Sequence, residues 1–177
     1  EGQLAEATSK SLGVTVSQLQ SSVDLREPCD AVGRDDGKGL VCYPVVALGG
    51  TFDHLHVGHK ILLTMASLLA DREIIVGVTD DAMLTKKSNA ALLEPIEERI
   101  ATVNAFISLV RLPFTPLVQR VVKLEDVAGP AATEANLQAL VVTDETLSGA
   151  DFIDGKRKEN ALASLENWVI GVVWQWH

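Results

Sequence analysis

From Tyr43 onward, short runs of apolar and β-branched residues alternate with longer segments whose apolar residues recur every three or four positions. The runs predict five strands: Pro44–Leu48, Glu73–Val78, Val118–Leu124, Ala139–Thr143 and Trp168–Val173. The longer segments predict helices over Gly58–Ala70, after Pro95 and over Ala150–Leu165. Strands that alternate with helices form βαβ units. The expected fold is therefore α/β, with a parallel sheet flanked by helices.

The composition supports one globular domain and restricts its partners. The chain has 177 residues, of which 47% are hydrophobic, and this is enough for one core. No apolar run approaches the roughly 18 residues of a membrane-spanning helix. The formal net charge is −9, so the chain repels nucleic acid and anionic membranes at long range, and we expect neither as a partner. Any anionic ligand must be held by local donors.

Residues 1–42 lack the regular pattern of the rest. Weakly amphipathic stretches are followed by Val32–Lys38, which is polar and rich in turn-forming residues. We expect 1–42 to be an N-terminal extension and linker, either mobile or packed on the domain, and 43–177 to be the domain. Cys29 and Cys42 could form one disulfide, but two cysteines favour free thiols in a reducing compartment, which predicts a cytoplasmic location.

The polar residues that could carry chemistry follow the predicted strands. In open parallel sheets, ligands bind beyond the carboxyl ends of the strands. Four loops meet this description: Gly49–Gly58, Thr79–Glu94, Glu125–Asn136 and Thr143–Gly149.

The first of these loops combines two glycines, a hydroxyl and three histidines at a helix start. Glycines let an anion approach the backbone, and the first N–H groups of a helix attract it. His56 and His59 are three positions apart, which places them on one helix face. Three interpretations are open: a tight turn with surface histidines, a metal site formed by His54, His56 and His59, or a site for phosphate chemistry.

The same loop resembles the signature of a known superfamily. Gly49–Lys60 (GGTFDHLHVGHK) is similar to the His-x-Gly-His motif of the nucleotidylyltransferases. Over Tyr43–Leu162 the chain resembles the eukaryotic-type phosphopantetheine adenylyltransferase family. Three segments carry that resemblance: Ala47–Leu63, Gly77–Arg99 and Leu124–Thr146. It implies a Rossmann-like nucleotidylyltransferase fold.

The resemblance also implies a reaction. ATP and 4′-phosphopantetheine would give dephospho-coenzyme A and pyrophosphate, a step of coenzyme A biosynthesis, with magnesium accompanying ATP. No kinase phosphate loop occurs in the sequence, so a dephospho-coenzyme A kinase, where needed, would be a separate chain. Two alternatives are a cytidylyltransferase of the same superfamily that acts on a phospho-alcohol, and a non-catalytic relative that binds nucleotide.

Roles for individual residues follow from the same resemblance. His59, His56 and Lys87 match catalytic residues, and no residue matches a metal ligand. Lys86 and Lys87, together with Thr51, match residues that hold the acceptor phosphate, although a solvated surface is the alternative for the lysine pair. The residues expected to bind nucleotide are Gly50, Thr51, Phe52, His59, Glu145, Thr146 and Arg157. For Arg157 the alternative is a solvated helix face.

The end of the sequence departs from the family. Relatives of this type continue into an Ile-Ser-Ser-x-x-x-Arg motif that grips the triphosphate of ATP, whereas this sequence ends in Trp174-Gln-Trp-His177. We therefore expect the domain to be truncated at its C-terminal end, and the chain to bind ATP weakly.

Overall fold

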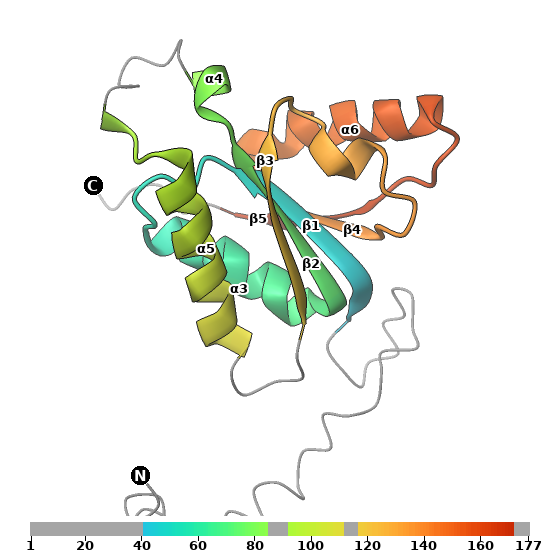
Figure 1. The fold of residues 1–177 in the computed structure, drawn as a ribbon. Coiled ribbons are helices and arrows are strands. Elements are labelled where there is room, and N and C mark those ends of the chain that lie inside the picture. The colour runs from blue at the N-terminus through green and yellow to red at the C-terminus, as the bar shows by residue number, and fades with distance from the viewer. Residues whose placement is uncertain (1–40, 85–91, 112–116, 172–177) are drawn as a thin grey trace, which may run out of the picture.

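The structure, a computed structural model, describes residues 41–84, 92–111 and 117–171 (Figure 1). One sheet of five parallel strands runs through the centre, in the order β3-β2-β1-β4-β5. The strands are β1 (Tyr43–Gly50), β2 (Ala70–Thr79), β3 (Val118–Leu124), β4 (Ala139–Thr143) and β5 (Glu166–Ile170). The expected α/β class with a Rossmann-like parallel sheet is confirmed.

The central strand β1 is buried on both faces, which explains its continuous apolar sequence. Leu48 and Val46 face one core, which contains the buried residues of α3 (Val57–Leu69) and α5 (Ile96–Arg111). Val45 and Ala47 face a second core, which contains those of α6 (Leu147–Glu159). Figure 1 shows α3 and α5 on one side of the sheet and α6 on the other.

Helix α5 forms where its sequence predicts. Pro95 stands just before the first helical residue, where its missing N–H costs nothing, and two glutamates occupy the first turn near the positive end of the helix dipole. Ile96, Val103 and Ile107 are buried at helical spacing. No helix in the described ranges is both long and apolar enough to cross a membrane.

The last two elements differ from their predicted bounds. Helix α6 begins three residues before Ala150 and ends at Glu159, because Asn160 and Ala161 turn the chain, the latter with a φ of 55°. Strand β5 spans Glu166–Ile170 rather than Trp168–Val173, and 172–177 lie outside the described residues. The predicted loops contain short helices: α4 (Asp81–Leu84), η2 (Gly129–Ala132) and η3 (Asp144–Thr146).

The strand order reverses direction between β1 and β4. From β1 the chain moves to β2 and then β3 on one side, and afterwards to β4 and β5 on the other. Ligands of open α/β sheets bind in the crevice at such a reversal, outside the carboxyl ends of the strands. The loops after β1 and after β4 border this point.

We expect the two faces of α5 to differ sharply in their contribution to stability. Ile107→Ala removes a side chain that is 0% exposed, so it should lower the free energy of unfolding by about 2–5 kcal/mol. Leu109→Ala removes a side chain that is 62% exposed and should change it by less than about 0.5 kcal/mol. Urea denaturation followed by circular dichroism measures both. Equal losses of unfolding free energy in the two variants would contradict the burial of Ile107 and the exposure of Leu109.

Candidate active site

The loop that leaves β1 folds tightly around a buried aromatic ring. Phe52 is only 1% exposed, and its φ of 51° is unusual for a residue with a side chain. A Cβ at Gly50 would lie 3.2 Å from the Phe52 ring, so this position favours glycine. The Gly50 carbonyl accepts a hydrogen bond from the Thr79 hydroxyl at 3.1 Å, which ties the loop to the end of β2.

His56 forms the N-cap of helix α3. Its Nδ1 accepts the backbone N–H of Gly58 at 3.2 Å, so the imidazole lies against the first turn of the helix. A Cβ at Gly58 would lie 3.1 Å from the His56 ring, which explains the glycine of the His-x-Gly-His sequence. A capping histidine with this bond carries its proton on Nε2 while it is neutral.

His59 lies between the cap and the buried aromatic ring. Its imidazole stacks on that of His56, with 3.8 Å between ring centroids, and lies 5.2 Å from the Phe52 ring. Its Nδ1 is buried and has no hydrogen-bond partner among the described residues. Burial, with a smaller contribution from His56, lowers the pKa of His59 to about 4. The predicted adjacency of the two histidines is confirmed, and their catalytic roles stay predictions.

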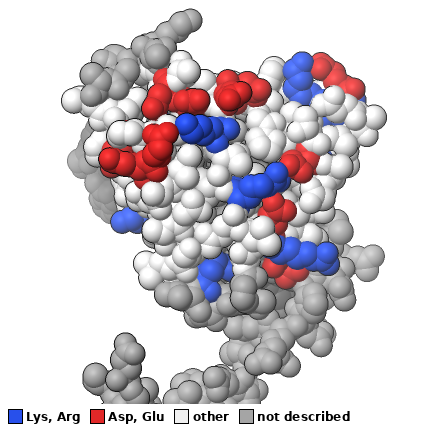
Figure 2. All heavy atoms as spheres, viewed as in Figure 1, with Lys and Arg blue, Asp and Glu red and all other residues white. Residues whose placement is uncertain are grey.

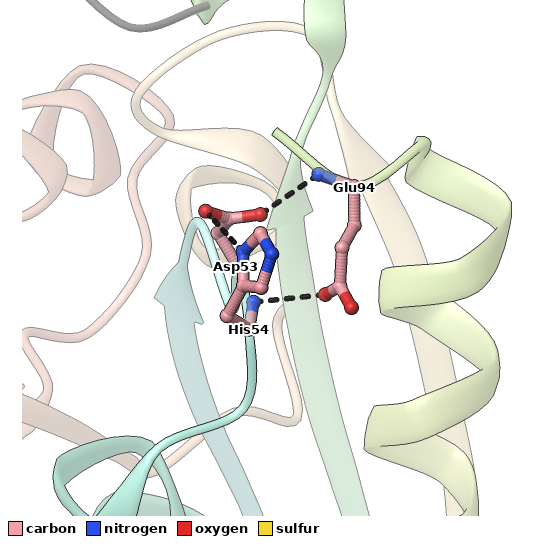
Figure 3. A group of neighbouring side chains, drawn as sticks. All are labelled: Asp53, His54 and Glu94. Atoms are coloured by element: carbon pink, nitrogen blue, oxygen red, sulfur yellow. Dashed lines mark hydrogen bonds and ion pairs between the residues drawn. The ribbon is translucent and has the colours of Figure 1, made fainter. Parts of the chain in front are cut away.

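His54 lies in a group with Asp53 and Glu94 (Figure 3). Its Nδ1 lies 2.9 Å from Asp53 Oδ2, and its backbone N–H donates to Glu94 Oε2 at 2.8 Å. The Glu94 N–H donates to Asp53 Oδ1 at 2.9 Å. These bonds fasten the first loop to the segment before α5. The hydrogen bond to Asp53 raises the pKa of His54.

The structure does not bring His54, His56 and His59 together as one group of candidate metal ligands. Within the described residues, the group that could hold a metal ion is Asp53, His54 and Glu94, whose ligand atoms lie within 4.8 Å of one another. Hydrogen bonds inside this group already occupy both Asp53 oxygens, one Glu94 oxygen and His54 Nδ1. We therefore interpret these bonds as a fastening of the loop to the segment before α5.

The segment after β4 lies at the same edge of the sheet as the first loop, because β1 and β4 are parallel neighbours. Its backbone is held by a capping box, in which Thr146 Oγ1 accepts the Thr143 N–H at 2.9 Å. The predicted nucleotide ligands Glu145 and Thr146 are both exposed there. Their place in the fold agrees with the prediction, whereas nucleotide binding by them stays untested.

Arg157 has a different role from the one predicted for it. Its side chain is 0% exposed, so neither phosphate binding nor a solvated helix face describes it. The guanidinium donates to four backbone carbonyls, those of Ala131, Glu134, Leu137 and Ala163. It thereby joins α6 to η2, to the segment before β4 and to the segment after α6, and its complete burial leaves no surface for a ligand.

Lys86 and Lys87 lie outside the described residues, so the structure does not test them. The sequence analysis did not single out Arg99, which is also 0% exposed and donates to the Thr51 carbonyl at 2.7 Å. The signal for it was present in the Leu-x-x-Pro-x-x-x-Arg spacing, which predicts a helix start but does not reveal where the guanidinium points.

The two perturbed histidines should titrate on opposite sides of the ordinary value near 6.5. His59 should titrate near 4, so the stability it contributes is present above pH 6.5 and is lost as the pH falls toward 4. His54 has a raised pKa, so its contribution is present below pH 6.5 and is lost as the pH rises through the folded value. Imidazole resonances in a ¹H–¹³C NMR titration measure both. A His59 midpoint near 6.5 would contradict the described burial.

Comparisons with known proteins agree on one family. The cytidylyltransferase-like family model matches residues 47–173. A phosphopantetheine adenylyltransferase of Saccharomyces cerevisiae is 38% identical over 131 residues, which are 74% of this chain and 42% of that protein. One of Thermococcus kodakarensis is 34% identical over 131 residues, 74% of this chain and 76% of that protein. The chain thus spans about two fifths of the yeast relative.

A solved structure is similar over the same region. The crystal structure of a protein of unknown function from Archaeoglobus fulgidus superimposes with a TM-score of 0.60 at 32% identity, covering 71% of this chain and 87% of that one. Fold, motif and relatives agree, and the resemblance drawn from Gly49–Lys60 is confirmed. The chain belongs to the cytidylyltransferase-like family of nucleotidyltransferases.

Proposed function

We propose that this chain transfers the adenylyl group of ATP to 4′-phosphopantetheine, giving dephospho-coenzyme A and pyrophosphate in coenzyme A biosynthesis. The observation that carries the proposal is the stacked His56–His59 pair at the N-terminus of α3, beside the reversal of strand order. The names of the relatives from yeast and Thermococcus support the choice of acceptor.

The chemistry suits a site that has donors and needs no strong base. The nucleophile is a phosphate monoester whose second pKa is about 6, so it is mostly a dianion at neutral pH. One of its oxygens attacks the α-phosphorus of ATP. The bond from that phosphorus to the bridging oxygen breaks, and pyrophosphate leaves with the electron pair. The protein has to bring two anions together and stabilise charge on the α-phosphate.

The first loop provides donors for that charge. In our proposal the His59 imidazole donates to an α-phosphate oxygen, and His56 donates through Nε2, because its Nδ1 is engaged by Gly58. The backbone of Gly50, Thr51 and Phe52 and the first turn of α3 add N–H groups and the positive end of a helix dipole. Glu145 and Thr146, at the same edge, are proposed to contact the nucleotide.

The surrounding surface makes these local donors necessary. Figure 2 shows acidic side chains gathered toward the upper left, over α4 and the first turn of α5, where Asp81, Glu97 and Glu98 lie. With a net charge of −9, the general field repels a triphosphate. Magnesium offsets part of this repulsion.

We infer that magnesium arrives with ATP as part of the substrate, held by the phosphates. The carboxylates of Asp53 and Asp81 near the loop are engaged by Glu94 and Arg99 respectively. Magnesium retains several waters and is commonly bound through substrate phosphates, so it needs no dedicated protein cage.

Replacing His59 tests the proposed site directly. His59→Ala should lower turnover by about 10²–10³-fold, the usual loss when one donor to developing charge is removed. Lys158→Ala, an exposed change on α6, is the control and should retain turnover. Pyrophosphate release with magnesium, ATP and 4′-phosphopantetheine measures the rate, and circular dichroism confirms folding.

Near-normal turnover in folded His59→Ala would refute the role of the histidine. Parallel reactions with CTP and phosphocholine decide the main alternative. Pyrophosphate released only from CTP would replace the proposed activity with cytidylyl transfer. No release from either nucleotide, together with saturable ATP binding in calorimetry, would favour the non-catalytic relative.

The lysine pair provides a second, independent test of the acceptor site. As a point charge beside the acceptor phosphate, Lys87 should matter for substrate more than for folding. We expect Lys87→Ala to lower phosphopantetheine turnover severalfold or more, and Lys86→Ala to have a milder effect. Steady-state kinetics with varied acceptor measure this. Negligible effects from both would assign the pair to the solvated surface.

A further inference from the structure

Arg99, in the first turn of α5, is a buried cation with four acceptors around it. Its side chain is 0% exposed. Burying a guanidinium is unfavourable unless its N–H groups are paired, and these are paired at short range. The acceptors are the carbonyls of Thr51 (2.7 Å), Thr79 (2.9 Å) and Glu94 (2.9 Å) and the carboxylate of Asp81.

These acceptors come from three separate stretches of the chain, because Thr79 and Asp81 are only two residues apart. Thr51 belongs to the loop that carries the histidines, Thr79 ends β2, Asp81 begins α4, and Glu94 precedes α5. A guanidinium is planar, and its donors point in fixed directions. One buried side chain therefore sets the positions of these three stretches relative to one another.

The same network reaches the histidine loop at a second point. The Glu94 carbonyl accepts from Arg99 Nε, while the Glu94 N–H and carboxylate hold Asp53 and the His54 backbone (Figure 3). Phe52, with a φ of 51°, lies between the anchored residues Thr51 and Asp53, and the anchored His54 has a φ of 43°. Non-glycine residues keep such conformations only when their surroundings enforce them.

We propose that Arg99 is the positioning residue of the active-site loop. By holding the Thr51 carbonyl and Glu94, it keeps Phe52 seated beneath His59, so that the two stacked imidazoles stand at the start of α3. Arg99 itself is 0% exposed, so it acts through the loop rather than on substrate. As a statement about catalysis the inference rests on the proposed function, whereas as a statement about loop geometry it does not.

Arg157 supplies a matched control for this inference. Both arginines are 0% exposed, and both donate to backbone carbonyls from several segments. Arg99 contacts the histidine loop, whereas Arg157 lies on the face of the sheet that α6 covers. A lysine in place of either keeps the charge but loses the planar fork of donors.

The test compares Arg99→Lys with Arg157→Lys at a temperature where circular dichroism shows both folded. Three of the four histidines of the chain lie in the loop, at positions 54, 56 and 59, so imidazole NMR observes it without substrate. In Arg99→Lys the His59 midpoint should rise from about 4 toward 6.5, because Phe52 no longer holds the ring in its buried place. In Arg157→Lys it should stay near 4.

Kinetics supply the second measurement. Displacing a reacting group by about 1 Å can cost about 10²-fold in rate, so kcat should fall by about that factor in Arg99→Lys and stay within about twofold in Arg157→Lys. An unchanged His59 midpoint together with an unchanged kcat in Arg99→Lys would overturn the inference. Equal changes in both variants would overturn it too, because they would reflect general loosening.

The experiment also covers two other outcomes, an inactive parent protein and a variant that does not fold. If the parent protein releases no pyrophosphate, the proposed function fails, but the NMR comparison still decides whether Arg99 positions the loop. If Arg99→Lys does not fold, Asp81→Asn replaces it, because this change weakens one of the four bonds and leaves Arg99 in place. It should move the His59 midpoint in the same direction by a smaller amount, and no movement overturns the inference.

Discussion

The parallel pairing of β1 with β2 on one side and β4 on the other is the constraint from which the site follows. Parallel neighbours end at the same edge of a sheet, so the loops after all three strands meet there. Because helices cover both faces of β1, its side chains are buried, and polar chemistry has room only where the strand stops. The chain changes at Gly49 from continuous apolar sequence to a loop of donors.

That loop is held in a shape it would not adopt alone. Two residues with side chains have positive φ, which a short polar loop would relax in water. Arg99 and Glu94 oppose this relaxation with hydrogen bonds whose loss would leave a buried charge unpaired. Folding free energy is thus used to preorganise the donors for the two anions of the proposed reaction.

The sequence predicted the elements better than their ends, for a physical reason. The strands predicted at Pro44–Leu48 and Ala139–Thr143 are continuous apolar runs. Such a run predicts a buried strand whichever residues pack against it. Helix α6 is largely polar, and its end at Glu159 depends on a local turn rather than on hydrophobic period. Within the site, the adjacency of His56 and His59 follows from helical spacing, whereas the turning of His54 toward Glu94 depends on a segment 40 residues away.

Arg157 is a second residue whose contacts could not be predicted from the sequence. A lysine stands on each side of it, and such a sequence suggests a side chain that faces solvent or binds phosphate. The four backbone carbonyls that it contacts, at 131, 134, 137 and 163, cannot be identified from the sequence around it. The family resemblance predicted that Arg157 binds nucleotide, whereas in the structure its N–H groups donate to backbone carbonyls. A buried arginine is therefore identified only once the topology has placed its acceptors.

The low pKa of His59 is compatible with its proposed role. Burial against Phe52 and the stacked His56 ring disfavours the imidazolium in the free protein, so His59 is neutral near pH 7. In the proposed reaction two bound phosphates would reverse the balance, since negative charge nearby favours protonation. The same exclusion of water that lowers the pKa strengthens every bond from the ring to phosphate. Positive charge on the ring is thus favoured most when negative charge on the α-phosphate is greatest, and this preference for the transition state over the substrate is what accelerates a reaction.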